Sequence, residues 1–252
     1  MQEHTIYNIL LMAWVVVGLV VFIALFFVSA PYGRHARKGW GYAFGDKTGW
    51  VLMEAASPIA FAACYAIGSN INITSGIFLV LWEAHYVHRA FIYPFSLRGA
   101  AKRLPLSVVM MGLTFNLMNG YLNGRYLFTF SGGYATSWLR DPRFIFGTAL
   151  FIIGFIINRY ADSVLRELRK PGESGYKVSN DGIYRLVSSP NYLGEITIWV
   201  GWAILTWSLP GLVFAFWTVA NLLPRARANH KWYQQNFPDY PPERKALIPR
   251  LW

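Results

Sequence analysis

Only 14% of the 252 residues are charged, whereas 55% are apolar and 17% aromatic, and the formal net charge at pH 7 is +11. Because about a quarter of the residues of an ordinary soluble domain are charged, this composition excludes a typical water-soluble domain and indicates a membrane protein. The single cysteine, Cys64, excludes an internal disulfide. No linker, repeat or low-complexity tract divides the sequence, so we predict a single membrane domain over residues 1–252.

Seven apolar segments are each long enough to cross a hydrocarbon layer of about 30 Å as a helix. They lie near residues 7–29, 49–69, 75–95, 105–124, 143–161, 191–208 and 210–226. The predicted fold class is all-α, a polytopic membrane protein with seven transmembrane helices, since lipid cannot satisfy the backbone groups of an irregular span. The sequence SLPG joins the last two helices as a tight hairpin. The first segment lacks a basic start and a cleavage site, so we interpret it as a retained helix.

The basic residues are distributed unevenly over the connections, and this distribution predicts the orientation in the membrane. The connections after the first, third and fifth spans and the C-terminal tail hold most of them, beginning with Arg34, Arg37, Lys38, Lys47, Arg98, Lys102 and Arg103. The alternate connections hold only Arg125, Arg140 and Arg143. We therefore expect the N-terminus outside and the C-terminus and the 162–190 loop in the cytoplasm. Because this asymmetry explains the net charge, no nucleic-acid partner is expected.

Three carboxylates, Glu54, Glu83 and Glu195, lie in or at the start of predicted spans, where ionisable groups are costly and usually functional. Pro58 removes the hydrogen bond to the carbonyl of residue 54 and should kink the helix there. A carboxylate beside such a break is well placed to face a cavity. The alternative for Glu54 is a buried glutamate paired with an arginine. The alternative for Glu195 is a favourable interaction with the dipole of the sixth helix.

The third span contains the polar sequence WEAHYVHRAFIY. On a regular helix Tyr86, Arg89 and Tyr93 share one face, and His85 and His88 share another. Because the chain has only five histidines, we expect a structural role for this pair and no metal site. The hydroxyl of Tyr86 stays protonated at neutral pH, so Tyr86 either packs or donates a hydrogen bond to a carbonyl oxygen.

The fourth span carries asparagines on one face and a pair of small residues. Asn116, Asn119 and Asn123 recur at i, i+3 and i+7, and they either bond neighbouring helices or line a polar pocket. Gly120 and Gly124 are spaced as in closely packed membrane helices.

The fifth helix continues past the membrane with a one-sided polar stripe. Within about 80° of arc it carries Asn158, Asp162, Arg166 and Arg169. We predict that Pro171 and Gly172 end this helix. After the loop, Ser189 and Pro190 are suited to the N-cap and first position of the sixth helix.

The end of the seventh span is basic and aromatic, with Arg225, Arg227, His230, Lys231 and Tyr233 in close succession. Positive-inside anchoring explains such a cluster. It does not explain why the preceding loop combines basic residues with Asn, Asp, Tyr and Glu. Together the two segments indicate a polar wall for a large anionic ligand. Neither a G-x-G-x-x-G nor a P-loop sequence is present, so a soluble Rossmann domain is excluded.

Several motifs, taken in order, identify a family. The sequences LRKPGE, VSSPNYLGE, WSLP, FAFW and DYPPERKALIP resemble the steroid 5-alpha-reductase family, the 3-oxo-5-alpha-steroid 4-dehydrogenases. WVLMEAASP and HYVHRAFIYPF are similar to the second and third helices of that family. The resemblance runs from about residue 49 to the end and is strongest over 158–252. The combination is specific, whereas each motif alone is weak.

The resemblance implies a seven-helix membrane enzyme that uses NADPH to reduce the C4–C5 double bond of 3-oxo-4-ene steroids. It implies that Glu54 and Tyr86 are catalytic and bind the 3-oxo group, with Trp50 and Arg89 in the same substrate site. The positions implied to hold NADPH are Asn158, Asp162, Arg169, Tyr176, Lys177, Asn191, Glu195, Arg225, Asn229 and Tyr233. Lys177 and Asn229 differ from the residues of some relatives. Residues 1–124 are then expected to form the substrate pocket and 143–252 the cofactor site.

The implied chemistry suits these side chains. Hydride adds to C5 while negative charge builds on the distant carbonyl oxygen, where preorganised donors lower the barrier. Tyr86 and a protonated Glu54 can both donate to that oxygen, and the enolate then takes a proton at C4. NADPH supplies the hydride, and the protein aligns it with the enone.

Other functions stay open at this point. A membrane methyltransferase related to the isoprenylcysteine carboxyl methyltransferases would bind S-adenosylmethionine instead of NADPH. A sterol-binding protein would consume no NADPH, and an enoyl-CoA or polyprenol reductase would share the chemistry with another substrate. The expected partners are a steroid-like lipophilic enone and the lipid bilayer, with no obligate protein partner. The expected location is the inner membrane of a bacterium or the endoplasmic reticulum of a eukaryote.

Overall fold

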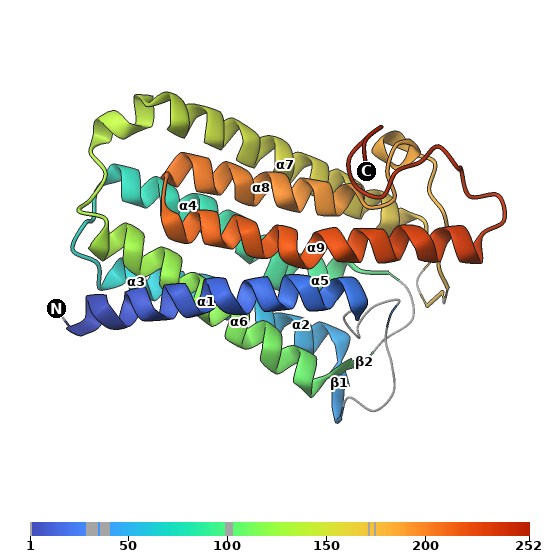
Figure 1. Ribbon diagram of the computed structural model, residues 1–252, viewed down its shortest axis with the longest axis horizontal. Coiled ribbons are helices and arrows are strands. Elements are labelled where there is room, and N and C mark those ends of the chain that lie inside the picture. The colour runs from blue at the N-terminus through green and yellow to red at the C-terminus, as the bar shows by residue number, and fades with distance from the viewer. Residues whose placement is uncertain (1, 29–34, 36–40, 99–102, 171, 174) are drawn as a thin grey trace. The chain divides into compact units, whose positions relative to one another are not determined.

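The computed structural model describes residues 2–28, 35, 41–98, 103–170, 172–173 and 175–252. Within these residues the chain is mostly helical, as predicted (Figure 1). Some residues used in the sequence predictions lie outside the described ranges, namely Arg34, Arg37, Lys38, Lys102 and Pro171.

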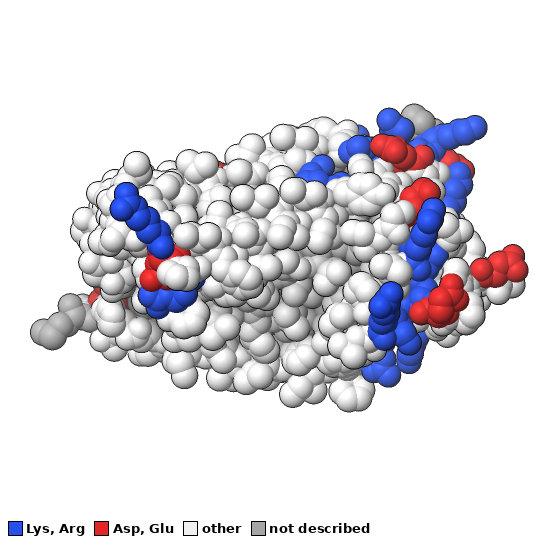
Figure 2. All heavy atoms as spheres, turned by 90° about the horizontal axis from the view of Figure 1, so that it is seen from above, with Lys and Arg blue, Asp and Glu red and all other residues white. Residues whose placement is uncertain are grey.

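The helices follow the predicted spans closely. They are α1 (Gln2–Phe27), α2 (Asp46–Glu54), α3 (Ala56–Ala66), α4 (Ile73–Val87), α5 (Tyr93–Ser96), α6 (Leu106–Arg125), α7 (Pro142–Glu167), α8 (Pro190–Thr206) and α9 (Leu209–Asn236). Among the described residues, three helical stretches are long and apolar enough to cross a membrane by length and composition: α1, the α2–α3 pair and α7. On the face drawn in Figure 2, with Lys and Arg in blue and Asp and Glu in red, most of the visible atoms belong to uncharged residues.

A short antiparallel sheet is the part of the fold that the all-α prediction misses. Its strands are β1 (Ala43–Gly45) and β2 (Arg103–Pro105), with Phe44 opposite Leu104. Leu104 also packs in a hydrophobic cluster with Met53 of α2. Strands of three residues are too short to leave a periodic signal in the sequence.

The chain divides into two compact units. The first unit comprises Met1–Trp14, Pro31–Leu97 and Ala101–Ile145. The second unit comprises Val15–Ala30, Arg98–Ala100 and Phe146–Trp252. The first unit thus contains α2 to α6, and the second contains α8, α9 and most of α7.

In the first unit, α3 packs directly on α6 through glycine. A Cβ atom at Gly124 would lie 2.7 Å from Cβ of Cys64, and one at Gly120 would lie 2.7 Å from the Ser57 carbonyl oxygen. A side chain at either position would hold the two helices apart, so the predicted close packing is confirmed.

In the second unit, α7 and α8 meet through two pairs of glycines. A Cβ atom at Gly201 would lie 2.7 Å from the Gly147 carbonyl oxygen, and one at Gly194 would lie 2.8 Å from that of Gly154. On each helix the two glycines are seven residues apart, which is about two turns. They therefore form one strip along which the backbones of the two helices touch.

The hairpin between α8 and α9 has the tight turn predicted from SLPG, and the two helices lie side by side (Figure 1). Trp207 takes a left-handed conformation with φ of 46°. Oγ of Ser208 caps α9 by accepting from the Gly211 N–H at 3.1 Å. α9 then continues to Asn236, beyond the predicted end of the span at residue 226, with Pro224 inside the helix.

The fifth predicted helix ends earlier than expected. α7 stops at Glu167, before the predicted stop at Pro171, and the N–H of Arg169 bonds the Arg166 carbonyl at 3.3 Å in a tighter final turn. Since a residue that precedes proline disfavours helical geometry, the helix unwinds ahead of residue 171. Arg169 therefore lies past the helix and not on its polar stripe, so that part of the prediction is wrong.

Candidate active site

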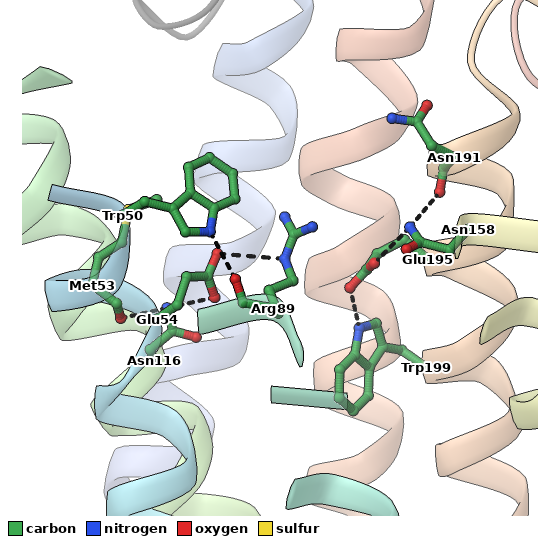
Figure 3. A network of polar contacts seen from close by, with 9 residues as sticks. All are labelled: Trp50, Met53, Glu54, Arg89, Asn116, Asn158, Asn191, Glu195 and Trp199. Carbon is green, nitrogen blue, oxygen red and sulfur yellow. Dashed lines mark hydrogen bonds and ion pairs between the residues drawn. The ribbon is translucent and has the colours of Figure 1, made fainter. Parts of the chain in front are cut away.

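The first polar group, the Glu54 cluster, comprises Trp50, Met53, Glu54, Arg89 and Asn116 (Figure 3). Only 8% of the Glu54 surface is exposed. Nε of Arg89 lies 3.4 Å from one of its carboxyl oxygens, and Nδ2 of Asn116 lies 3.4 Å from the other. Asn116 also donates to the Met53 carbonyl at 2.8 Å. Both carboxyl oxygens thus accept from donors, so the alternative interpretation of Glu54, pairing with an arginine, finds its partner in Arg89.

The helix break predicted beside Glu54 is confirmed. α2 ends at Glu54 and α3 begins at Ala56, so Ala55 stands between the two helices. Pro58 has no N–H to offer the carbonyl of Glu54, which removes the bond that would continue the helix. The carboxylate consequently lies at the junction of two consecutive helical segments.

Arg89 lies in a π-helical segment, His88–Ile92, between α4 and α5. Its guanidinium carbon is 5.1 Å from the ring centroid of Trp50 and 5.7 Å from that of Tyr93. Nε1 of Trp50 donates to the Arg89 carbonyl at 3.1 Å. The regular helix on which Tyr86, Arg89 and Tyr93 were predicted to share a face is thus interrupted by a π-turn, although Arg89 and Tyr93 do lie against each other. Such segments are frequent at functional sites.

Tyr86 is buried in α4, with 3% of its surface exposed. Its ring centroid lies 5.2 Å from that of Trp82 and 5.1 Å from that of His85. Trp82 itself stacks on Phe61 of α3 at 4.4 Å. This packing fixes the phenol oxygen, as a preorganised donor requires. Among the described residues, no three His, Cys, Asp or Glu side chains gather as a metal site.

The second polar group, the Glu195 cluster, comprises Asn158, Asp162, Asn191, Glu195 and Trp199, most of it drawn in Figure 3. Nδ2 of Asn158 donates to Glu195 and to the Asn191 carbonyl, both at 3.0 Å. Nε1 of Trp199 donates to the other oxygen of Glu195 at 2.9 Å. Nδ2 of Asn191 donates to Asp162 at 3.2 Å. The structure therefore brings together four residues that the sequence assigned to the cofactor.

The glycine strip brings Asn158 to Glu195. A Cβ atom at Gly194 would lie 2.5 Å from the backbone nitrogen of Asn158 and 2.8 Å from its Cα. With glycine at this position, α7 approaches α8 closely enough for the Asn158 amide to reach the carboxylate of the next residue. The start of α8 at Pro190 is as predicted, although Ser189 makes no side-chain cap.

Arg225 and Asn229 of α9 reach α8 through Tyr192. The Tyr192 hydroxyl accepts from Nε of Arg225 at 2.9 Å and from Nδ2 of Asn229 at 3.4 Å. Because Tyr192 follows Asn191 directly, these two predicted residues are joined to the segment that carries the Glu195 cluster.

Three residues that were predicted to hold the cofactor lie in the loop between α7 and α8: Arg169, Tyr176 and Lys177. The Arg169 guanidinium lies over the Tyr176 ring at 4.8 Å, and this ring lies 5.1 Å from that of Trp232 on α9. Nζ of Lys177 pairs with Glu173 at 2.7 Å. The hydrogen bond from Lys177 lowers the pKa of the Glu173 carboxyl. Lys177 is thus engaged by a carboxylate of its own loop.

Sequence reasoning missed several residues that organise the second unit. Trp199 could have been found, because it stands four residues after Glu195 on the same helix face. The strip of Gly147, Gly154, Gly194 and Gly201 could have been found from its seven-residue spacing. Nothing in the sequence indicates that Tyr233 stacks on Tyr240 of the tail, with ring centroids 5.3 Å apart and an interplanar angle of 5°.

These features define the class, an integral membrane protein with buried polar clusters among its helices. Residues 102–252 match the family model described as 3-oxo-5-alpha-steroid 4-dehydrogenase. The 3-oxo-5-alpha-steroid 4-dehydrogenase 1 of Bos taurus is 40% identical over 239 residues, covering 93% of this chain and 92% of that protein. The Homo sapiens protein of the same name is 40% identical over 238 residues, covering 93% and 91%. Steroid 5-alpha-reductase DET2 of Gossypium hirsutum is 38% identical over 258 residues, covering 100% and 99%. The chain belongs to the 3-oxo-5-alpha-steroid 4-dehydrogenase family.

Proposed function

We propose that the protein reduces the C4–C5 double bond of 3-oxo-4-ene steroids to 5α-reduced 3-oxo steroids, with NADPH as the reductant. The observation that supports this most is the Glu54 cluster, a buried carboxylate at a helix break with Arg89 and Asn116 as its partners. Ionisable groups within a membrane span are seldom retained for packing alone. The names of the relatives agree with this substrate class.

On the substrate side, we assign Tyr86 as the donor to the 3-oxo oxygen. Its ring is fixed by packing, so the hydroxyl is positioned before charge develops on that oxygen. Glu54 lies beside the same oxygen, either as a protonated donor or as the ionised partner of Arg89. Trp50 completes the site by holding the backbone and guanidinium of Arg89.

On the cofactor side, the chemistry of the side chains suits a dinucleotide phosphate. The Glu195 cluster supplies buried amide and carboxylate groups, which suit the carboxamide and hydroxyl groups of NADPH. Arg169, Lys177 and Arg225 supply cations, which suit its phosphates. When bound, NADPH supplies the hydride that adds to C5. The protein's own part is to hold the cofactor, exclude water and stabilise charge on the steroid oxygen.

The topology is part of the proposal. We infer seven transmembrane helices, an outer N-terminus and a cytoplasmic C-terminus from the seven apolar segments and the unequal basic residues of the connections. The cofactor side chains that follow α7 and those in the last turns of α9 would then face the cytoplasm, where NADPH is present. The membrane would be the inner membrane of a bacterium or the endoplasmic reticulum of a eukaryote.

Purified protein, incubated with NADPH and a 3-oxo-4-ene steroid, should oxidise NADPH and release the 5α-reduced 3-oxo steroid. The control is the matching steroid without the double bond, which should leave NADPH unchanged. Binding of S-adenosylmethionine without NADPH oxidation would instead support the methyltransferase, and steroid binding without turnover would support the sterol-binding protein.

The cofactor assignment has its own test. Asn158→Ala, Asp162→Ala and Arg169→Ala should each weaken NADPH binding far more than steroid binding. Ser163→Ala is the matched control, because Ser163 adjoins Asp162 but bonds only the Tyr160 carbonyl of its own helix. Unchanged NADPH affinity in all three folded variants would reject this placement.

A further inference from the structure

Three segments of the second unit meet at the hydroxyl of Ser188. Oγ of Ser188 lies 2.6 Å from Nδ1 of His230 on α9, 2.6 Å from the Tyr240 hydroxyl of the tail, and 3.1 Å from the Lys245 carbonyl. Ser188 is 5% exposed and Tyr240 7%. Backbone bonds support the same junction, because the Ser188 N–H donates to the Lys245 carbonyl at 2.8 Å and the Lys245 N–H donates to Leu186 at 3.0 Å.

The donors and acceptors at this junction can all be satisfied with a neutral His230. The Lys245 carbonyl can only accept, so the single proton of Ser188 is directed to it. Oγ of Ser188 then accepts from the Tyr240 hydroxyl and from Nδ1–H of His230. Nε2 of His230 is left to accept from the amide nitrogen of Gln234 at 3.0 Å. Every group is satisfied when His230 is a neutral imidazole with its proton on Nδ1.

A second proton on His230 conflicts with this arrangement. It would add a cation near that of the buried Arg244, whose guanidinium carbon lies 4.8 Å from the ring centroid of Tyr240, and the Tyr240 ring lies 5.8 Å from the ring of His230. The groups facing His230 from the tail are Tyr240, Arg244 and Lys245, whereas Ser188 of the loop and Gln234 of α9 are neutral. Burial, followed by these two cations, lowers the pKa of His230 from its ordinary value of 6.5.

The junction lies beside the residues assigned to the cofactor. Ser188 precedes by two positions Pro190, the first residue of α8, and His230 follows Asn229, which reaches the Tyr192 hydroxyl of α8. Tyr240 stacks on Tyr233, another residue of the proposed cofactor site. Movement at this junction would therefore alter how the start of α8 lies against α9.

We propose that His230 is a positioning residue for cofactor binding: as a neutral imidazole it closes a clamp with Ser188 and Tyr240 that holds the start of α8 on α9, and its protonation opens the clamp. This inference rests on the proposed function, in that the second unit is taken to bind NADPH. The opened state binds the proton more tightly than the closed state. The closed state therefore loses stability as the pH falls below about 6.5, and NADPH affinity falls with it.

The test compares the dissociation constant of NADPH near pH 8 and near pH 5.5 in wild type and His230→Gln. Because a single proton is linked, the wild-type constant should rise by at most about tenfold for each pH unit below about 6.5, the ordinary pKa of a histidine, and should level off below the lowered pKa of His230 in the closed state. Glutamine can donate to Ser188 but does not titrate. His230→Gln should therefore lack the part of the rise in the NADPH dissociation constant that comes from protonation of His230. His4→Gln, the same change at an exposed site, should keep it. If the ratio of the dissociation constant near pH 5.5 to that near pH 8 is the same in wild type and His230→Gln, the proposal is overturned.

Hydrogen exchange of the cofactor-free protein provides a second measurement. At one acidic pH, the amides of Ser188 and Lys245 should exchange faster in wild type than in His230→Gln, and equal rates there would also overturn the clamp. If His230→Gln does not fold, Tyr240→Phe replaces it, since it keeps the ring and should weaken NADPH binding near pH 8. Wild-type affinity in Tyr240→Phe would contradict the clamp. Failure of wild type to bind NADPH at any pH would reject the proposed function, whereas the exchange measurement still tests the clamp.

Discussion

Replacing Gly194 by alanine tests how the fold builds the Glu195 cluster. The new methyl carbon would lie 2.5 Å from the backbone nitrogen of Asn158, 2.8 Å from its Cα and 2.8 Å from the Gly154 carbonyl oxygen. All three neighbours are backbone atoms, which no change of rotamer can move. Since ordinary van der Waals contact begins at 3.4 Å, α7 and α8 must separate by 3.4 − 2.5 = 0.9 Å at this point.

The separation has two consequences of predictable size. Overpacking of this kind typically costs about 1–3 kcal/mol, and rigid backbone neighbours favour the upper end of that range. The opening also acts on the bond from Asn158 to Glu195, which is 3.0 Å long. Lengthened by 0.9 Å, it would pass the limit of a hydrogen bond and leave one oxygen of a buried carboxylate without this donor. Cofactor affinity should therefore fall together with stability.

The matched control is Gly76→Ala in α4, where the new methyl carbon would lie 3.7 Å from the Tyr65 hydroxyl, an ordinary contact. Both changes replace a helical glycine by alanine, so the gain in helix propensity of about 1 kcal/mol cancels in the comparison. Thermal unfolding in detergent should place Gly194→Ala about 2–12 °C below Gly76→Ala, at about 2–4 °C per kcal/mol. Equal midpoints, with wild-type NADPH affinity in Gly194→Ala, would refute this reasoning.

Three further predictions concern the reaction and the topology. Tyr86→Phe should bind NADPH normally but lose about 10²–10³-fold in turnover of a 3-oxo-4-ene steroid, and wild-type turnover would remove Tyr86 from the reaction. If the native Glu54 carboxyl donates to the steroid oxygen, Glu54→Gln should lose less turnover than Glu54→Ala. Equally large losses of turnover in the two variants would instead show that the ion pair with Arg89 is the important contact of Glu54. A cysteine at the exposed Gln235, introduced into Cys64→Ala, should react with an impermeant reagent only from the cytoplasmic side, so labelling from outside sealed cells would reverse the orientation.

Features with a local signal could be predicted from the sequence. The break after Glu54 follows from Pro58, close packing of α6 on another helix follows from Gly120 and Gly124, and the hairpin before α9 follows from SLPG, whereas only the fold shows that the partner of α6 is α3. Each depends on residues within one or two turns of one another. Four side chains of the Glu195 cluster, all except Trp199, could also be singled out, because Asn158 and Asp162 lie on one face of α7 and Asn191 and Glu195 lie at the start of α8.

Features that depend on distant partners could not be predicted. The π-helical turn around Arg89 breaks the regular spacing on which the sequence analysis relied. The clamp joins Ser188 to residues 42 and 52 positions away, His230 and Tyr240, and helical periodicity carries no information about such pairs. The pairing of Glu54 with Arg89 was one of two interpretations, and only the fold supplies the partner.

The sequence NYLGE at residues 191–195 shows how a motif acts as a physical unit. The Asn191 carbonyl accepts from Asn158, and its amide donates to Asp162. The Tyr192 hydroxyl accepts from two side chains of α9. These two residues therefore connect α8 to a different helix on each side.

Gly194 and Glu195 depend on each other within the same motif. A buried carboxylate is costly unless it is hydrogen-bonded. One donor to Glu195, the indole of Trp199, comes from its own helix and needs no tertiary structure. A second donor, the amide of Asn158, comes from α7 and reaches Glu195 because position 194 has no side chain. Glycine at 194 thus gives the carboxylate at 195 a donor from the neighbouring helix, and the two residues together shape the proposed cofactor site.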